Sequence, residues 1–459
     1  MYSTSATAQL CEIMLRDSAH IQMFEAEWRN RKAARSGGKL KEFVPLYDMD
    51  AAVNVCKQFV GCEYDRVYDI AEGIKIRFTD VGHLLGSASI EVWATEKTEN
   101  GDVTEKIVFS GDIGNINKPI IKDPKHVRDA DYVVMESTYG NRSHGGTPNY
   151  VEDLTDIFKR TFERGGNVVI PSFAVGRTQE LLYIIRKIKE DNLVGRDFDV
   201  YMDSPLAIEA TNIFIKNVES CFDDEAVELV RKGINPLTFP GLKYATTGDE
   251  SKQINFDPNP KVIISSSGMC EAGRIRHHLK HNLWRPECTI VFVGYQAVGT
   301  TGRIIVDGAE EIKLFGEPIQ IKAEIVQLQG SSGHADKDGL LCWINAFDRK
   351  PKKVFVVHGE DSVCDEFTEC LKEEYGYDAM APYTGGSYDL IADRVISEGV
   401  KERKTRRTTS TQRGKTVFDR LVAAGKRLMT VITHNEGGTN KDLAKFTDQI
   451  NALCDKWDR

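Results

Sequence analysis

The chain has 459 residues, of which 41% are hydrophobic and 28% are charged. A chain of this length and composition can bury a large core, and we expect two or three domains. Its formal net charge of −9 excludes a surface that is basic all over, so any contact with nucleic acid must depend on local patches. No apolar run of about 18 residues occurs and the first residues do not form a secretory signal, so we expect no membrane partner.

The cysteines give an expectation about the cellular compartment. All ten are scattered singly, without a C-x-x-C pair or a short repeating spacing. This is not the pattern of a disulfide framework. We therefore expect reduced thiols in a cytoplasmic protein.

The first elements in chain order are a helix and a group of strands. A helix is expected from Thr7 to about Arg31, where five apolar residues recur near the helical period of about 3.6 residues. Strand-like runs separated by turns follow between about Ile74 and Val134, and they predict a sheet with at least one covered face. The periodic helix residues are Leu10, Ile13, Met14, Ile21 and Phe24, and the strand-like runs are IKIRFTDV, SIEVWAT, EKIVFSGD and YVVMES.

A second rhythm begins near Gly165, where the order strand, loop, helix occurs three times. This alternation predicts a parallel α/β module. Strand-rich sequence then resumes with IQIKAEIVQLQG and KKVFVVHG, so the module is expected to be inserted into the first domain. The predicted divisions are 1–165, 166–315, 316–390 and 391–459.

The last division contains a basic linker at 401–415 and two helices, FDRLVAAGKRLMTVI and KDLAKFTDQINALCDKW. The apolar faces of these helices are expected to pack either on the core or on a second subunit. A homodimer is therefore one arrangement that the sequence leaves open.

Five short polar motifs each follow an apolar, strand-like run. Buried strands of an α/β sheet deliver their last residues to one rim, so five such endings predict one assembled site. A single histidine after a strand is more often a hydrogen-bonded structural residue, but imidazole and carboxylate together are the ligands that suit zinc. The motifs are GHLLGSAS around His83, FSGDIGN around Asp112, VVMESTYG around Glu136, SSGHAD around His334 and FVVHGE around His358.

Two basic segments are candidates for contact with nucleic acid. The first, GRIRHHLKHNLWR, follows a glycine-marked turn, whereas the second, at 401–415, has the Thr, Ser and Arg content of a linker. The turn SSSG at 265–268 either holds a phosphate through backbone N–H groups or is an ordinary strand-to-helix turn. Neither a P-loop nor a serine-hydrolase elbow nor a dinucleotide fingerprint is present in the sequence.

Seven motifs in order resemble one known family, the β-CASP branch of the metallo-β-lactamase superfamily, which includes ribonuclease J and the endonuclease that cleaves pre-mRNA for polyadenylation. They are GHLLGSAS, SGDIGN, ESTYGNRSH, IPSFAVGRTQELL, SSGMCEAGRIRHHL, SGHAD and VVHGE, and the likeness runs from the first residues to about Tyr388. The resemblance implies an α/β fold, namely a metallo-β-lactamase αββα sandwich with an inserted parallel α/β β-CASP domain. It also implies a zinc-dependent RNA-processing nuclease that holds single-stranded RNA between the two parts.

Site roles follow from the resemblance by position. His83 corresponds to a zinc ligand, Asp112 to a carboxylate that bridges two zinc ions, and His358 to a ligand at the second ion. Glu136 and His334 correspond to an acid and a histidine near the scissile phosphate, so the expected catalytic set is Asp112, Glu136 and His334. Two zinc ions about 3.5 to 4 Å apart can share a hydroxide and hold both the attacking and the leaving oxygen.

The sequence departs from the family at one point. The family's main metal motif, H-x-H-x-D-H, lies upstream of the part that matches Met1 onward, and no two histidines here are separated by one residue. His83, Asp112 and His358 alone cannot fill two zinc coordination spheres. We expect an N-terminally incomplete sandwich and an incomplete ligand set, from a fragment or a late start; the alternatives are a metal-poor relative kept for RNA binding and a segment supplied by another chain.

The predicted function is hydrolysis of RNA phosphodiester bonds. One alternative is a catalytically inactive RNA-binding or scaffold subunit, which zinc stoichiometry would distinguish, and another is hydrolysis of a small thioester or lactone. The inserted module favours a polymer that carries phosphates. Its expected RNA-binding residues are Arg177, Ser267, Arg274, His277 and His278.

Overall fold

The computed structural model describes residues 1–35, 42–99, 101–143, 149–328 and 332–400, together with 425, 428–429, 431–433, 435 and 440–457. The chain divides into two compact units, Met1–Gly399 and Val400–Arg459. The second unit contains α14 (Asn440–Trp457), which confirms the last predicted helix. The predicted basic linker at 401–415, and most of the helix predicted after it, lie outside the described residues. In the part of the chain that is described, no helix has the length and apolarity needed to cross a bilayer.

Within the described residues, the first unit contains a mixed seven-stranded sheet with strand order β17-β16-β7-β6-β5-β4-β3. All four strand-like runs predicted between Ile74 and Val134 lie in this sheet, so those predictions are confirmed. The strands are β3 (Val67–Ala71), β4 (Ile74–Asp80), β5 (Ala88–Thr98), β6 (Gly101–Phe109), β7 (Tyr132–Glu136), β16 (Lys353–Val357) and β17 (Ala379–Met380).

Layers on both faces of this sheet give the αββα order. On one face, α11 (Lys337–Ile344) and α12 (Asp361–Glu373) bury their apolar sides against β6, β7 and β16. On the other face, Ile76 and Phe78 of β4 pack with Cys62, which belongs to a parallel pair of short strands. That pair is β1 (Tyr2–Thr4) and β2 (Val60–Cys62), and its outer layer is α1 (Ser5–Arg35) with α2 (Met49–Cys56).

The described part of the first unit also contains a parallel six-stranded sheet, with order β10-β9-β11-β8-β12-β15. Its central strands are buried at every position, as expected for a parallel sheet with helices on both faces. The strands are β8 (Val168–Pro171), β9 (Asp199–Asp203), β10 (Leu242–Tyr244), β11 (Lys261–Ser265), β12 (Thr289–Val293) and β15 (Glu324–Leu328). The sheet thus runs in sequence to Leu328, while the limits 166–315 and the other predicted divisions stay predictions.

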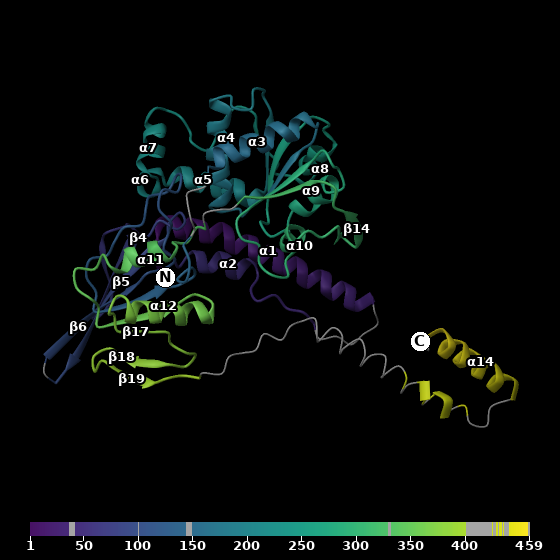
Figure 1. The fold of residues 1–459 in the computed structure, drawn as a ribbon. Coiled ribbons are helices and arrows are strands. Elements are labelled where there is room, and N and C mark those ends of the chain that lie inside the picture. Colours follow the sequence, from purple (N-terminus) through teal and green to yellow (C-terminus); the bar gives the residue numbers. More distant parts are fainter. Residues whose placement is uncertain are drawn as a thin grey trace. The chain divides into compact units, whose positions relative to one another are not determined.

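The remaining elements of the first unit surround this sheet or form small hairpins (Figure 1). The helices are α3 (Tyr150–Glu163), α4 (Arg177–Glu190), α5 (Pro205–Lys216), α6 (Val218–Cys221), α7 (Asp224–Arg231), α8 (Gly248–Phe256), α9 (Ile275–Asn282) and α10 (Thr301–Val306). The hairpins are β13 (Glu311–Leu314) with β14 (Glu317–Gln320), and β18 (Ser387–Asp389) with β19 (Arg394–Ser397). We call the seven-stranded sheet with its layers the first lobe, and the six-stranded sheet with its helices the second lobe.

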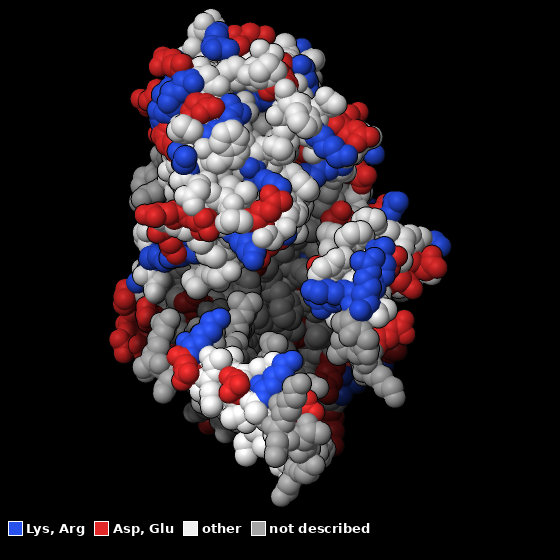
Figure 2. All heavy atoms as spheres, turned by 90° about the vertical axis from the view of Figure 1, so that its right-hand side faces the viewer, with Lys and Arg blue, Asp and Glu red and all other residues white. Residues whose placement is uncertain are grey.

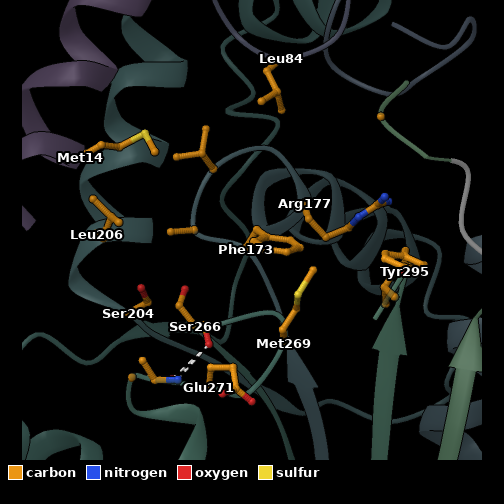
Figure 3. Close-up of a pocket in the computed structure, with 18 of the residues that line it drawn as sticks. Met14, Leu84, Phe173, Arg177, Ser204, Leu206, Ser266, Met269, Glu271 and Tyr295 are labelled. Carbon is orange, nitrogen blue, oxygen red and sulfur yellow. Dashed lines mark hydrogen bonds between the residues drawn. The ribbon is translucent and has the colours of Figure 1, made fainter. Parts of the chain in front are cut away.

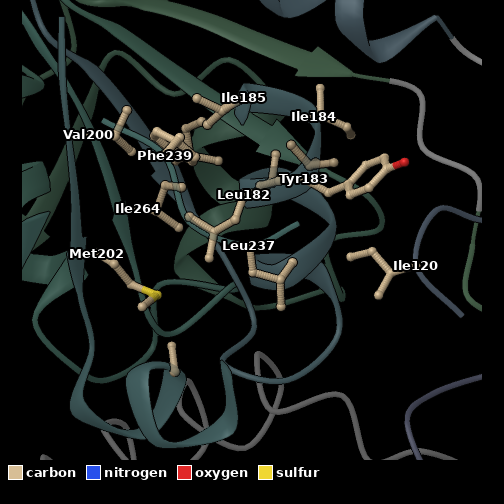
Figure 4. Close-up of a cluster of buried hydrophobic side chains, with 14 of the residues drawn as sticks. Ile120, Leu182, Tyr183, Ile184, Ile185, Val200, Met202, Leu237, Phe239 and Ile264 are labelled. Carbon is tan, nitrogen blue, oxygen red and sulfur yellow. The ribbon is translucent and has the colours of Figure 1, made fainter. Parts of the chain in front are cut away.

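The two lobes share one hydrophobic cluster. Figure 4 shows its centre, where side chains of α4, β9 and β11 pack with Ile120 from the loop after β6. Ile120 is 1% exposed although its φ of 81° lies in the left-handed region, which is rare for a β-branched residue. Burial of such a side chain contributes roughly 1.5 to 3 kcal/mol, enough to offset that strain. The shared core therefore fixes the loops of the first lobe against the second lobe.

The surface is not basic all over. On the face shown in Figure 2, Lys and Arg side chains are mixed with Asp and Glu side chains. This agrees with the net charge of −9. Local groups rather than a general positive field must therefore attract any anionic partner.

Candidate metal centre and cleft

Four of the five motifs lie at one edge of the seven-stranded sheet. β6, β7 and β16 are parallel neighbours, and β4 runs in the same direction because two antiparallel pairings separate it from β6. The carboxyl ends of these strands therefore meet at one rim. The residues that they deliver there are His83, Asp112, Glu136 and His358.

His334 reaches the same rim from the second lobe. The chain returns after β15 and forms an antiparallel bridge between His334 and Gly114, in which Ala335 N donates to Ile113 O at 2.7 Å. A Cβ at Gly114 would lie 2.0 Å from the carbonyl oxygen of Gly82. Glycine is therefore needed at position 114 for the loop after β6 to approach the loop after β4.

The five side chains converge. His83 Nε2 lies 3.9 Å from Asp112 Oδ2, and His358 Nδ1 lies 3.3 Å from Asp112 Oδ1. The His83 and His334 rings are 4.4 Å apart, and the His334 and His358 rings 5.7 Å. His83, Asp112 and His334 form one group with ligand atoms within 4.8 Å of one another, and Glu136, His334 and His358 form a second.

Glu136 and His334 form a charged pair. Glu136 is 1% exposed, and its carboxylate accepts from Ile113 N and Thr138 N and lies 3.1 Å from His334 Nδ1. Burial raises the pKa of Glu136, but the hydrogen bond and charge of His334 outweigh it and hold the pKa below its usual value. Burial lowers the pKa of His334, but the Glu136 carboxylate outweighs it and holds that pKa above its usual value.

His83 is held neutral. Burial, together with the nearby positive groups His334 and Lys118, lowers its pKa to about 4, against a smaller opposing effect of Asp112. Its Nδ1 is buried and makes no hydrogen bond of normal geometry with the described residues. A neutral imidazole with an orphaned nitrogen, next to a carboxylate, is what a metal ligand requires.

His358 is aimed at the rim by its backbone. Its φ is 50°, in the left-handed region, and its carbonyl accepts from Ser137 N at 3.3 Å and from Thr138 Oγ1 at 3.2 Å. Histidine enters this region more readily than most residues, but the conformation still costs roughly 1 kcal/mol. The result is an exposed ring whose Nδ1 faces Asp112.

The donor set fits zinc. The imidazoles of His83 and His358 and the carboxylate of Asp112 offer the nitrogen and oxygen ligands that zinc takes in hydrolytic sites. Among the described residues, these side chains are fewer than two four-coordinate ions would use. The described residues therefore do not supply the zinc ligands that the sequence comparison with the family found missing.

A cleft of about 1470 Å³ opens from the centre, within the first unit. Its walls come from α1, from the rim loops of the first lobe and from the turns that follow β8, β9, β11 and β12. Figure 3 shows Phe173, Arg177, Met269 and Tyr295 around this cleft. This volume exceeds the roughly 300 to 1,000 Å³ of a typical small-molecule site, so it suits a polymer better than a compact ligand.

The predicted RNA-binding residues differ in how free they are to contact a ligand in the cleft. Arg177 and Ser267 line the cleft, and Arg177 Nη1 lies 2.7 Å from Glu180. Arg274 also lines it, but its guanidinium donates to the Asp203 carboxylate and to the carbonyls of Ala245 and Thr246. Arg274 therefore already makes three hydrogen bonds within the protein, which its guanidinium would have to share with an RNA ligand.

The adjacent histidines of α9 point in different directions. His277 is exposed and stacks on Phe315 with ring centroids 4.4 Å apart. His278 is 0% exposed, and its Nε2 lies 2.7 Å from the Asp203 carboxylate. The prediction that His278 contacts RNA is therefore wrong, because its fully buried ring is held by Asp203 and has no access to the cleft.

Three residues of the cleft were missed from the sequence. Asp203 ends β9 as Glu136 ends β7, so the run VYMD carried the same signal as the five motifs. Lys118 Nζ lies 3.1 Å from Glu180 and donates to the carbonyl of His83 at 3.0 Å. No sequence signal marks Lys118 or Glu180, because their contact joins distant parts of the chain.

Comparisons with known proteins define the class. Residues 178–305 match the Beta-Casp domain, and residues 318–382 match the Zn-dependent metallo-hydrolase RNA specificity domain. With the fold and the site, these matches define an RNA-acting, zinc-dependent metallo-hydrolase.

Individual relatives give the family. Ribonuclease TTHA0252 of Thermus thermophilus is 32% identical over 361 residues, which cover 79% of this chain and 75% of that protein. The RNase J-like protein of Methanocaldococcus jannaschii is 35% identical over 63% of this chain and 65% of its own length. Transcription termination factor FttA of Methanosarcina mazei is 32% identical over 76% of this chain, which spans only 54% of that factor. The chain belongs to the β-CASP branch of the metallo-β-lactamase superfamily, with an α/β metallo-β-lactamase fold and a β-CASP insertion.

Proposed function

We propose that the centre hydrolyses phosphodiester bonds of single-stranded RNA. The observation that carries the proposal is the convergence of His83, Asp112, Glu136, His334 and His358, since two of them, His83 and His334, line a cleft large enough for a polymer. Two of the relatives are named as a ribonuclease and as an RNase J-like protein, which supports the same reaction.

Zinc is the cofactor of this proposal. His83, Asp112 and His358 would hold it, as two ions when the ligand set is complete. Bound zinc would supply a hydroxide at neutral pH and neutralise the charge that develops on the phosphate. The low pKa of His83 keeps the ring neutral, so the lone pair of one ring nitrogen is available to a metal.

Residues of the chain itself would supply the proton to the leaving oxygen and hold the RNA strand. Glu136 faces His334 Nδ1 and holds that imidazole in its protonated form, so a proton on Nε2 can pass to the leaving oxygen. Arg177, held by Glu180 at the wall of the cleft, would contact the RNA backbone.

The test combines cleavage of an end-labelled single-stranded RNA with the zinc content of the purified chain. We expect zinc-dependent cleavage that is lost in His334→Ala and kept in His126→Ala, which removes an exposed histidine outside the centre. Salt-dependent RNA binding without zinc and without cleavage would instead identify an RNA-binding subunit. Absence of both binding and cleavage would reject an RNA function.

A further inference from the structure

One side of α1 carries large apolar residues that the fold leaves exposed. Met14 is 47% exposed, Ile21 43%, Phe24 58% and Trp28 53%. Their spacing places them on one side of the helix, since residues three, four and seven apart share a face. Contiguous exposed apolar side chains of this kind mark an interaction surface.

This side of α1 continues the cleft. Met14, Ile21 and Phe24 line the cleft together with His83 and His334. Figure 3 shows Met14 on the same wall as Leu206, which lies in the first turn of α5. From Met14 to Trp28 the helix rises about 21 Å, and Trp28, unlike Met14, Ile21 and Phe24, is not among the residues that line the cleft.

Cations follow the aromatic residues on the same side. Lys32 and Arg35 lie within the last turns of α1, and Lys32 Nζ is 5.1 Å from the centre of the Trp28 ring. Nearby, Glu25 pairs with Arg29. Exposed aromatic rings next to cations are typical of surfaces that hold single-stranded nucleic acid, because bases stack on the rings while the cations attract phosphates.

We infer that this surface, called the α1 platform and made of Met14, Ile21, Phe24, Trp28, Lys32 and Arg35, binds the part of a single-stranded RNA that extends beyond the cleft. Bases stack on Phe24 and Trp28, and Lys32 and Arg35 contact the backbone. The inference rests on the proposed function. A protein partner is disfavoured because burial of the cations at the end of the platform would cost their hydration.

The experiment compares two RNAs in the His334→Ala background, which keeps His83, Asp112 and His358 but is not expected to cut. A short RNA of about 6 nucleotides fills the cleft alone, and a long RNA of about 16 nucleotides also reaches the platform. Fluorescence anisotropy gives both dissociation constants. Adding Trp28→Ala and Lys32→Ala, at two residues beyond those that line the cleft, should weaken binding of the long RNA at least about tenfold and of the short RNA less than about twofold.

Met23→Ala is the matched control, because Met23 is 42% exposed on the same helix but lies about 100° around the axis from Phe24. It should change neither constant by more than about twofold. Lys32→Ala should reduce the slope of log affinity against log salt for the long RNA by roughly 0.7, as expected for one lost phosphate contact.

The outcomes separate the two proposals. Unchanged binding of the long RNA in the double variant rejects the α1 platform while the proposed function stands. Equal weakening for both RNAs also rejects it, because the loss would then arise inside the cleft. A change of oligomeric state in the double variant, seen by size exclusion, would assign the surface to a second copy of the chain instead. If the background protein binds neither RNA, the proposed function fails and the platform falls with it.

Discussion

Two histidine–carboxylate pairs with similar chemistry lie in the two lobes. In the first lobe, Glu136 ends β7 and pairs with His334 at 3.1 Å, and 20% of the His334 side chain is exposed. In the second lobe, Asp203 ends β9 and pairs with His278 at 2.7 Å, with both side chains fully buried. The difference teaches that exposure of the imidazole, rather than the pair itself, separates a candidate catalytic group from a structural one.

The largest expected effect tests the accessible pair. His334→Ala should lower the rate of RNA cleavage by about 10² to 10⁴, because it removes the group proposed to protonate the leaving oxygen. The zinc content should stay close to that of the unchanged chain, and the rate is compared per folded molecule because Glu136 loses its charged partner. Single-turnover cleavage measures the rate, and turnover within about tenfold of the original would contradict the assigned role.

The buried pair should respond in the opposite way. Asp203→Ala should lower the free energy of unfolding by about 3 to 5 kcal/mol, because it leaves Arg274 and His278 without their buried partner. Cleavage per folded molecule should remain. Urea denaturation gives the free energy, and Asp199→Ala at the partly exposed start of the same strand is the control, with an expected loss below about 1 kcal/mol. Loss of cleavage without loss of stability in Asp203→Ala would erase the distinction between the lobes.

A third buried carboxyl, that of Asp80, should make the stability of the fold depend on pH. Asp80 is 5% exposed, and burial raises its pKa to about 6, from the usual 3.8. The folded chain therefore binds more protons than the unfolded chain between these two values, and this residue's contribution to stability is lost as the pH rises through about 6. Asp80→Asn keeps an acceptor for Gly82 N and should raise the free energy of unfolding above pH 6 by about 1 to 3 kcal/mol. An unchanged pH dependence of the melting temperature would contradict this explanation.

The smallest expected effect is a shift of the pH profile. Glu136→Gln removes the carboxylate that holds the pKa of His334 above its usual value. His334 should then lose its proton at lower pH, and the alkaline limb of the cleavage profile should move to lower pH. A matched profile of the unchanged chain is the control. An alkaline limb that stays in place would mean that His334 does not supply the proton.

The sequence identified the polar residues at the strand ends, but not the buried residues that hold them in place. Strand endings at His83, Asp112 and His358 could be recognised because each polar residue interrupts an apolar run. The same reasoning could not tell which of His277 and His278 would be buried. Lys118 and Glu180 could not be found at all, because a buried ion pair between distant segments leaves no local pattern.

The helix at the start of the chain shows a different limit. Its apolar period predicted the helix correctly, and α1 extends a few residues beyond the predicted ends. Apolar period normally indicates a face turned to the core. Ile21 and Phe24 instead remain exposed along the cleft, because the neighbouring lobe covers only the earlier turns of the helix, where Ala6 and Leu10 are buried.

The most direct test of the central claim is to locate the metal. Crystals of the chain grown with zinc can be measured at the zinc absorption edge, where anomalous scattering identifies the ion. The account predicts a peak between His83, Asp112 and His358, and its loss in crystals of Asp112→Ala. Zinc bound elsewhere, or RNA cleavage by a chain whose rim binds no metal, would contradict it.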